Sequence, residues 1–504
     1  MKKIIIETLI SSEKTVVVED NKLTEILIQD KKKESKVSNV YRGIVKKVLK
    51  GINACFVDIG FEKLAYLQTS ENIKCSDEVI VQVNKEEVGE KGAKLTREIS
   101  ISGRYLVYIP TNLKITLSKK IEDENEKKRL LDIVKELTDN NGYIIRTEAQ
   151  NASKEDLEND IKYLNKEYEN ILNEYKLGIG PKLLYKNIDK SSKYIKDNIN
   201  DEVDEIIVNN KEKYSELEEI LKSINRDYIK KIKLYENEDI FDLFNVNSQI
   251  KKVLDKKVWL KSGGYLIIEK TEALTVIDVN TGKFTGNLEL EETVYKTNIE
   301  ACIEICRQLK LRDIGGIIIV DFIDMKNENK KQDIINKLEE EFKKDKRKTN
   351  VHKMTSLGLV EITRKREKEP IDKYYKSDLE KKDIMSIDFL IDEIEKEIIR
   401  IINHTVYKKL SIVLNTVSLQ NIKNNFMYNI RNIENTYNVK LDLKESKEIS
   451  YDEFNIVYNT WQIFYKVVIL INVGRTEKVI KLLLKYLYGE FLDRGGVLFN
   501  VRYS

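Results

Sequence analysis

The chain has few of the residues on which disulfide scaffolds and histidine-based catalytic sites depend. Its 504 residues include only four cysteines and two histidines, His352 and His404. Four cysteines in a chain of this length are too few for a disulfide framework. Two histidines are a poor supply for a histidine-based acid–base mechanism.

Long apolar runs are also absent from the sequence. The most apolar stretch, at 464–473, is far shorter than the ~20 residues needed to cross a bilayer, and it contains a lysine. No signal-peptide pattern follows Met1. We therefore expect a cytoplasmic protein without a membrane span.

Neither sign of charge is in large excess. The 88 basic and 85 acidic side chains leave a net charge of +3, so a polyanionic partner must bind local basic patches. One candidate is the segment 341–368, which contains ten lysine or arginine residues against four acidic ones. Such a run can follow a phosphate backbone, and it can equally be a solvated face.

The length and apolar content predict a multidomain globular protein. About three to five domains are expected for a chain of this size, and 41% of the residues are apolar. Three β-branched runs in residues 2–30 predict an antiparallel meander, and five short strands over 38–98 predict a small closed barrel. The pattern over 120–200 is mainly helical, with a strand-like break at 143–147.

Further along, the sequence predicts a strand–helix–strand unit. KSGGYLIIEK and ALTVIDVN form an expected hairpin, and GGIIIVDF is typical of a strand buried on both faces. The helix between them, at 291–311, has one stripe expected to be buried: Val294, Asn298, Ala301, Cys302, Ile305 and Leu309. The order β, α, β predicts parallel strands with a right-handed crossover.

An aspartate closes each strand of this unit. Parallel strands end at the same edge of a sheet, so Asp278 and Asp321 should lie close together, where open α/β sheets bind ligands. Asn280 faces the same side as Asp278 because side chains alternate along a strand. A single aspartate at a strand end is more often a turn or cap residue, but this convergence favours a site. Asp324 would point away from Asp321 in an extended run, and a structural role suits it equally.

Two neighbouring carboxylates repel each other, and a divalent cation is the natural compensation. Hard oxygen ligands without cysteine or histidine favour Mg²⁺, or Mn²⁺ as an alternative, over zinc. The predicted chemistry is metal-assisted phosphodiester hydrolysis. Cys302 and Cys306 lie four residues apart on the expected buried face, so we interpret them as core thiols rather than metal ligands.

At this point the sequence resembles the ribonuclease E/G endoribonucleases, and most closely their short ribonuclease G type, since a long acidic tail is missing. The similar stretches are EALTVIDVNTGKF, KTNIEACIEICRQLKLRDIGGIIIVDFIDM, LGLVEITRKR, VYRGIVKKVLKGINACFVDIG and VIVQVNKEEVGEKGAKLTREISISGRYLV. The resemblance implies a Mg²⁺-dependent, single-strand-specific endoribonuclease for rRNA and tRNA processing and mRNA decay. Such an enzyme cuts A/U-rich RNA, leaves 5′-monophosphate ends and is stimulated by a 5′-monophosphate on its substrate. In the family pattern Asp278 and Asp321 bind the metal and Asn280 orients them.

The resemblance also implies an RNA contact in the barrel. Phe56 and Tyr66 match aromatic positions on which the family stacks bases, and Lys91 matches a basic RNA contact. Both rings could instead belong to the barrel core.

A 5′-phosphate sensor is implied as well. Arg146, Thr147, Gly103 and Val107 fall at the family's sensor pocket. A guanidinium fork and a hydroxyl suit a terminal phosphate dianion. Without the resemblance, Arg146 would be interpreted as a surface arginine.

The implied fold class is multidomain α+β and α/β. The expected parts are an RNase H-like subdomain split between 1–37 and 196–253, an OB-fold RNA-binding insert at 38–98, a 5′-sensor region at 99–195, a DNase I-like catalytic subdomain at 254–372, and a small C-terminal α/β domain at 385–460. Residues 461–504 match nothing that suggests a role.

The sequence departs from the family pattern after TRKR. Family members carry a CPxC pair there, through which two subunits share one zinc, whereas residues 367–386 contain no cysteine. We expect 373–384 to be a linker that replaces this element. Zinc is therefore not expected, and a homodimer or homotetramer would have to form without it.

Two other functions remain open. The first is a catalytically silent RNA-binding or ribosome-assembly factor on the same fold, which the intact acidic pair disfavours. The second is a DNA nuclease on an RNase H-like scaffold. Competition between RNA and DNA single strands in a cleavage assay would separate it from a ribonuclease.

Overall fold

The computed structural model describes residues 1–31, 35–87, 91–138, 142–236, 238–282, 290–345, 347–355, 357–366, 370–376 and 385–458. The chain divides into two compact units, Met1–Asp372 and Lys373–Ser504. In the described part of the chain, no helix combines the length and the apolar character that a bilayer span requires.

The first unit begins with a five-stranded sheet built from two distant segments. The predicted antiparallel meander is confirmed and consists of β1 (Lys2–Thr8), β2 (Ser12–Glu19) and β3 (Lys22–Asp30). Strands β14 (Val203–Val208) and β15 (Ile232–Leu234) continue the sheet in parallel from β1. Apolar side chains of α3 (Lys190–Asn198) and α4 (Lys211–Ile224) share its core.

Between these two segments lies a closed five-stranded barrel. Its strands pair in the order β4 (Val40–Leu49), β5 (Ala54–Asp58), β6 (Ala65–Gln68), β8 (Lys94–Thr96) and β7 (Glu78–Lys85). The β4–β7 pairing closes the barrel, as the spacing of short strands predicted. Strand β13 (Lys182–Tyr185) adds to β4 from outside this ring.

A four-stranded sheet with two long helices follows the barrel. The sheet has the order β11 (Thr116–Leu117), β12 (Gly142–Ile145), β10 (Leu106–Ile109) and β9 (Ile101–Ser102). Helix α1 (Glu124–Leu137) begins after the N-cap Asp123, and α2 (Lys154–Lys176) begins with a Ser153–Asp156 capping box. Both helices contribute to one core with the sheet.

The last part of the first unit contains the predicted strand–helix–strand unit. Its sheet has the order β16 (Lys257–Trp259), β17 (Tyr265–Lys270), β18 (Leu274–Asn280), β19 (Gly316–Asp321), β21 (Leu359–Arg364) and β20 (Thr349–Val351). The β17–β18 hairpin and the parallel β18–β19 pair are confirmed. The connecting helix α7 (Leu290–Leu311) buries the predicted stripe, and α8 (Glu328–Lys343) shares its core. Two short helices, α5 (Ile240–Leu243) and α6 (Val246–Leu254), precede this sheet.

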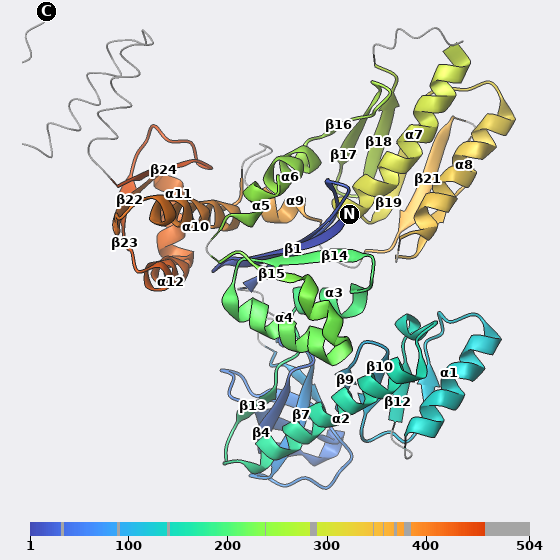
Figure 1. Cartoon of the computed structure of the whole chain (residues 1–504). Coiled ribbons are helices and arrows are strands. Elements are labelled where there is room, and N and C mark those ends of the chain that lie inside the picture. The colour runs from blue at the N-terminus through green and yellow to red at the C-terminus, as the bar shows by residue number, and fades with distance from the viewer. Residues whose placement is uncertain are drawn as a thin grey trace, which may run out of the picture. The chain divides into compact units, whose positions relative to one another are not determined.

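The prediction that β19 is buried on both faces is wrong. Helices α7 and α8 lie side by side over one face of the sheet (Figure 1), and Ile318 and Val320 are buried there. On the other face Ile317 is 51% exposed and Asp321 is exposed. β-Branched residues favour strands on either face, so a continuous apolar run does not show that both faces are covered.

The second unit contains a three-stranded sheet and three helices among its described residues 385–458. The sheet has the order β23 (Lys440–Glu445), β22 (Lys409–Leu414) and β24 (Phe454–Val457). The helices are α10 (Ile387–His404), α11 (Thr416–Asn425) and α12 (Met427–Tyr437), and a short helix, α9 (Asp372–Tyr375), spans the boundary between the units. Most of the expected linker at 373–384, and all of 461–504, lie outside the described residues.

Candidate active site

Asp278 and Asp321 stand directly opposite each other on the parallel strands β18 and β19. Neighbouring strands are about 5 Å apart, so two carboxylates in this register can approach one ion. Both side chains are exposed on the open face of the sheet, whereas Ile277 and Val320 point into the core. The strand period of two therefore turns both acids away from the helices.

Asn280 completes the arrangement as the sequence predicted. Its Nδ2 donates a hydrogen bond of 2.7 Å to Oδ2 of Asp278. The bond orients the carboxylate and leaves its second oxygen for another contact. Asn280 lies on the same face of β18, two residues further along.

The electrostatics of the pair fit a hard cation. Partial desolvation, followed by the negative charges of Asp278 and Asp324, raises the pKa of Asp321. A cation between the carboxylates would remove this repulsion. Within the described ranges, no group of three or more His, Cys, Asp or Glu side chains is arranged so that it could hold a metal ion. The protein would therefore supply two carboxylates to a metal, which suits Mg²⁺ because this ion keeps several waters or phosphate oxygens.

One positioning residue was not identified from the sequence. Asn298 of α7 is fully buried, and its Nδ2 donates to the Ile323 carbonyl oxygen at 2.8 Å. Its Oδ1 accepts from the Ile323 N–H at 3.2 Å. The amide thus holds the backbone two residues after Asp321. The sequence feature that could have identified Asn298 is its position as a polar residue in an otherwise apolar helical stripe.

The barrel places Phe56 and Tyr66 next to each other on its outer surface. They are cross-strand partners with ring centroids 6.1 Å apart, and both are half-buried outside the barrel core. Lys47 pairs with Phe56, and Lys94 pairs with Tyr66. The strand register thus creates a row of two rings between two lysines, which local sequence patterns did not predict. Lys91 is exposed, three residues before Lys94.

Arg146 is bound by groups of the protein itself. Its Nη1 lies 2.9 Å from Oδ1 of Asp197 and also donates to the carbonyl oxygens of Gly103 and Arg104. The Thr147 hydroxyl lies 3.0 Å from the Ser118 hydroxyl. The structure thus brings Arg146 and Gly103 together around an internal ion pair.

Asp160 of α2 fills the turn beside this pair, and sequence reasoning missed it. Its carboxylate accepts from the backbone N–H groups of Arg104, Tyr105 and Leu106 at 2.8–2.9 Å. A side chain at Gly103 would place Cβ 2.4 Å from Oδ2 of Asp160. The glycine therefore permits the approach of this carboxylate. Val107 lies on β10, where it pairs with Ser102 and Ile144.

The two cysteines of α7 are core residues. Cys302 is fully buried and Cys306 is partly buried against the same core. Burial raises the pKa of both thiols, which keeps them protonated at neutral pH. These observations agree with the interpretation as core thiols.

The described part of the basic run at 341–368 does not lie on a single element. It is divided among the end of α8, β20 and β21. The Arg364 side chain is buried, where it pairs with Asp345 and donates to the Ile314 carbonyl oxygen. At least this arginine stabilises the core instead of facing a phosphate backbone.

Comparisons with known proteins find similar sequences over most of this chain. A model of the ribonuclease E/G family matches residues 100–367. Ribonuclease G of Escherichia coli (strain K12) is 38% identical over 375 residues, covering 69% of this chain and 77% of that protein. Ribonuclease G of Haemophilus influenzae is 38% identical over 380 residues, covering 70% and 77%. Ribonuclease E of Buchnera aphidicola subsp. Schizaphis graminum is 34% identical over 392 residues, covering 73% and 40%. The chain belongs to the ribonuclease E/G family.

Proposed function

We propose that this protein is a Mg²⁺-dependent endoribonuclease that cuts single-stranded, A/U-rich RNA and leaves 5′-monophosphate ends. Mn²⁺ is the alternative ion, and rRNA and tRNA processing and mRNA decay in the cytoplasm are the expected roles. Family membership supports the enzyme class. The observation that carries the mechanism is the direct opposition of Asp278 and Asp321 on an open sheet face.

In this mechanism Asp278 and Asp321 would hold the ion. When bound, it would supply an activated water and neutralise negative charge on the phosphate. Asn280 keeps the Asp278 carboxylate oriented through its 2.7 Å hydrogen bond. Asn298 keeps the backbone after Asp321 in place through two hydrogen bonds to Ile323. Asp278 and Asp321 are exposed on this face of the sheet, where a flexible single strand could approach them.

The test compares Asp278→Asn and Asp321→Asn with the parent protein on a 5′-monophosphorylated, A/U-rich oligoribonucleotide. We expect each variant to lose cleavage by about 100-fold or more, the scale expected for a missing electrostatic group. RNA affinity in EDTA should persist, because the carboxylates bind the ion and not the strand. Fluorescence anisotropy of labelled RNA measures this affinity.

Asp442→Asn is the matched control, since Asp442 is an exposed strand aspartate of the second unit. It should cleave at the parent rate. Cleavage at the parent rate by Asp278→Asn or Asp321→Asn would refute the site. Equal cleavage of a DNA strand of the same sequence would favour the DNA-nuclease alternative. No cleavage by the parent protein with Mg²⁺ or Mn²⁺ would favour the silent RNA-binding factor.

We assign the remaining parts by the same family relation. The first sheet would be the split RNase H-like subdomain, the barrel an OB-fold RNA-binding insert, and residues 254–372 a DNase I-like catalytic subdomain. Phe56, Tyr66 and Lys91 would grip single-stranded RNA by stacking and charge. The half-buried aromatic pair between Lys47 and Lys94 supports this role.

The 5′-phosphate sensor would consist of Gly103, Val107, Arg146 and Thr147. Asp197 already binds the Arg146 guanidinium. A substrate phosphate must therefore displace the Asp197 carboxylate or bind Arg146 together with it. Replacing Arg146 would break a half-buried ion pair, so Thr147 gives the cleaner test. Thr147→Val should reduce the preference for 5′-monophosphate over 5′-hydroxyl RNA by roughly 10-fold, the value of one hydrogen bond to a charged group.

The measurement is the ratio of cleavage rates on the two RNAs. Thr116→Val is the control, because Thr116 is an exposed threonine of the same sheet. It should leave the ratio unchanged. A parent protein that cuts both RNAs equally would remove the sensor proposal.

A further inference from the structure

On the open face of the catalytic sheet, an exposed tryptophan and a half-buried tyrosine lie on the two strands that precede β18. Trp259 on β16 is 64% exposed, and its ring centroid lies 5.4 Å from that of Tyr265 on β17. The Lys257 Nζ lies 4.0 Å from the first ring centroid and 3.8 Å from the second. Large exposed apolar side chains that gather in this way mark binding surfaces.

The strand register connects this cluster to the acidic pair. Trp259 pairs with Tyr265, and Tyr265 pairs with Asn280. Directly opposed residues share one face, so both rings point to the same side as Asn280. In the adjacent row, Lys257 pairs with Ile267, and Ile267 pairs with Asp278. The two rings therefore lie about one and two strand spacings, roughly 5 and 10 Å, from Asn280. Asp278 lies in the next row on the same strand, and Asp321 lies one strand further away.

The chemistry of this surface fits a nucleotide. Two carboxylates repel a polyanion, so a strand that reaches them needs favourable contacts nearby. An exposed indole offers a stacking surface to any base, and a lysine between the rings can meet the attached phosphate. The unstacked bases of a single strand supply both groups.

We infer that Trp259, Tyr265 and Lys257 form a subsite for the RNA nucleotide next to the scissile phosphate, with the base stacked on Trp259. This inference rests on the proposed ribonuclease function. It assigns a second aromatic contact on the catalytic sheet, separate from the ring pair of the barrel. Stacking makes the subsite tolerant of base identity and selective for unpaired strands.

Tryptophan fluorescence tests the contact directly. The chain has two tryptophans, so Trp461→Phe leaves Trp259 as the sole tryptophan, which can be excited selectively over tyrosine. Titration with A/U-rich single-stranded RNA in EDTA, which prevents metal-dependent cleavage, should quench this emission saturably, with the same midpoint as anisotropy of labelled RNA. RNA binding without a change in Trp259 emission would overturn the inference. This readout does not depend on cleavage, so it remains valid if the proposed reaction fails.

Substitution of Trp259 tests how much this side chain contributes to RNA binding and cleavage. Trp259→Ala should weaken RNA affinity and kcat/KM by roughly 5- to 100-fold, the range for one lost base stack, and Trp259→Phe should restore most of it. Tyr428→Ala is the control, since Tyr428 is 77% exposed on α12 of the second unit. Parent-like affinity in Trp259→Ala would refute the subsite while leaving the endonuclease intact. Loss of an oligomer on sedimentation with unchanged RNA affinity would show a protein contact instead.

Discussion

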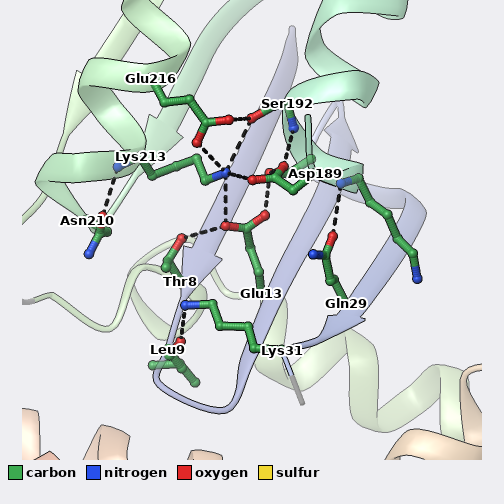
Figure 2. A network of polar contacts seen from close by, with 12 residues as sticks. Thr8, Leu9, Glu13, Gln29, Lys31, Asp189, Ser192, Asn210, Lys213 and Glu216 are labelled. Atoms are coloured by element: carbon green, nitrogen blue, oxygen red, sulfur yellow. Dashed lines mark hydrogen bonds and ion pairs between the residues drawn. The ribbon is translucent and has the colours of Figure 1, made fainter. Parts of the chain in front are cut away.

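The ammonium group of Lys213 is a buried charge of the first unit with three carboxylate partners. In Figure 2 it lies at the centre of a network formed with Glu13, Asp189, Ser192 and Glu216. Its Nζ lies 3.2 Å from Glu13 and 3.0 Å from Glu216, and it also contacts Asp189. Lys213 and Glu13 are each 5% exposed. One buried cation thus balances three carboxylates between β2, α3 and α4.

Lys213→Met should be strongly destabilising because it leaves the carboxylates together without their cation. Removing one partner of a buried ionic network costs about 3–5 kcal/mol. Urea unfolding followed by circular dichroism measures the change. Lys222→Met on the same helix is the control, since Lys222 is exposed and pairs with the half-buried Glu218. The control should change stability by less than about 1 kcal/mol. Similar losses in both variants would contradict the assigned role of the network.

The same variant has a defined pH dependence. Burial alone would raise the pKa of Asp189, but the Lys213 ammonium holds it below its usual value. In the parent protein this contribution to stability is therefore present above the unfolded pKa of Asp189 and is lost as pH falls through its lower folded pKa. Burial, followed by the charge of Asp189, already raises the pKa of Glu13 in the parent protein. Without Lys213 the pKa of Asp189 should rise above its unfolded value and that of Glu13 should rise further, so protonation of both groups favours the fold.

The deficit of Lys213→Met relative to the parent should consequently shrink as the pH falls from about 8 to about 5. Parallel urea titrations of the two proteins at several pH values would show this. A stability difference between the two proteins that stays constant over this range would contradict the expected rise in the pKa values of these carboxylates.

The turn between β16 and β17 positions the end of β18. A Cβ at Gly264 would lie 2.7 Å from the Asn280 carbonyl oxygen and 2.9 Å from Cγ2 of Thr297. Only a residue without a side chain permits this approach. Because Asn280 orients Asp278, a change in the packing of this turn should also shift the acidic pair.

Gly264→Ala should therefore lower stability by about 1–3 kcal/mol, the usual cost of overpacking. It should also reduce cleavage, because β18 must shift to accept the methyl group. Thermal unfolding and a cleavage assay measure the two effects. Gly51→Ala is the control, since a Cβ there has no neighbour within 4 Å. Retained stability and activity in Gly264→Ala would show that the turn can relax.

Prediction from the sequence succeeded for elements defined by local periodicity. The β17–β18 hairpin, helix α7 with its buried stripe, and the parallel β18–β19 pair were all found as expected. The open face of β19 was not predicted, because a run of β-branched residues looks the same whether one face or both are covered. The helical period places Asn298 in the buried stripe but does not reveal its role. That role depends on hydrogen bonds to Ile323, which lies 25 residues further along the chain.

Within the first unit, Arg42 connects the barrel to the end of α2. Its side chain is buried, and its guanidinium donates to the carbonyl oxygens of Tyr175, Leu177, Gly178 and Gly180. A cation is well placed among the unpaired carbonyls at a helix C-terminus. The barrel is thereby held to the segment that leads back to the first sheet.

The absence of cysteine from residues 367–386 predicts an assembly that does not depend on zinc. Structural zinc sites use Cys or His ligands, and chelators destroy assemblies that need them. We expect the purified protein to contain no stoichiometric zinc and to have the same sedimentation coefficient with and without EDTA. Metal analysis together with sedimentation velocity checks both points. Dissociation on chelation would show that another set of ligands replaces the missing pair.

The hydrophobic periodicity of the sequence was sufficient to place Asp278, Asn280 and Asp321 at one edge of a sheet. This worked because alternation along a strand and the hand of a βαβ crossover are local rules. The partners of Arg146 and the row from Lys47 to Lys94 follow from contacts between segments far apart in the chain. The same holds for the aromatic pair beside the acidic site, because strand register and side-chain packing arise only when separate segments come together.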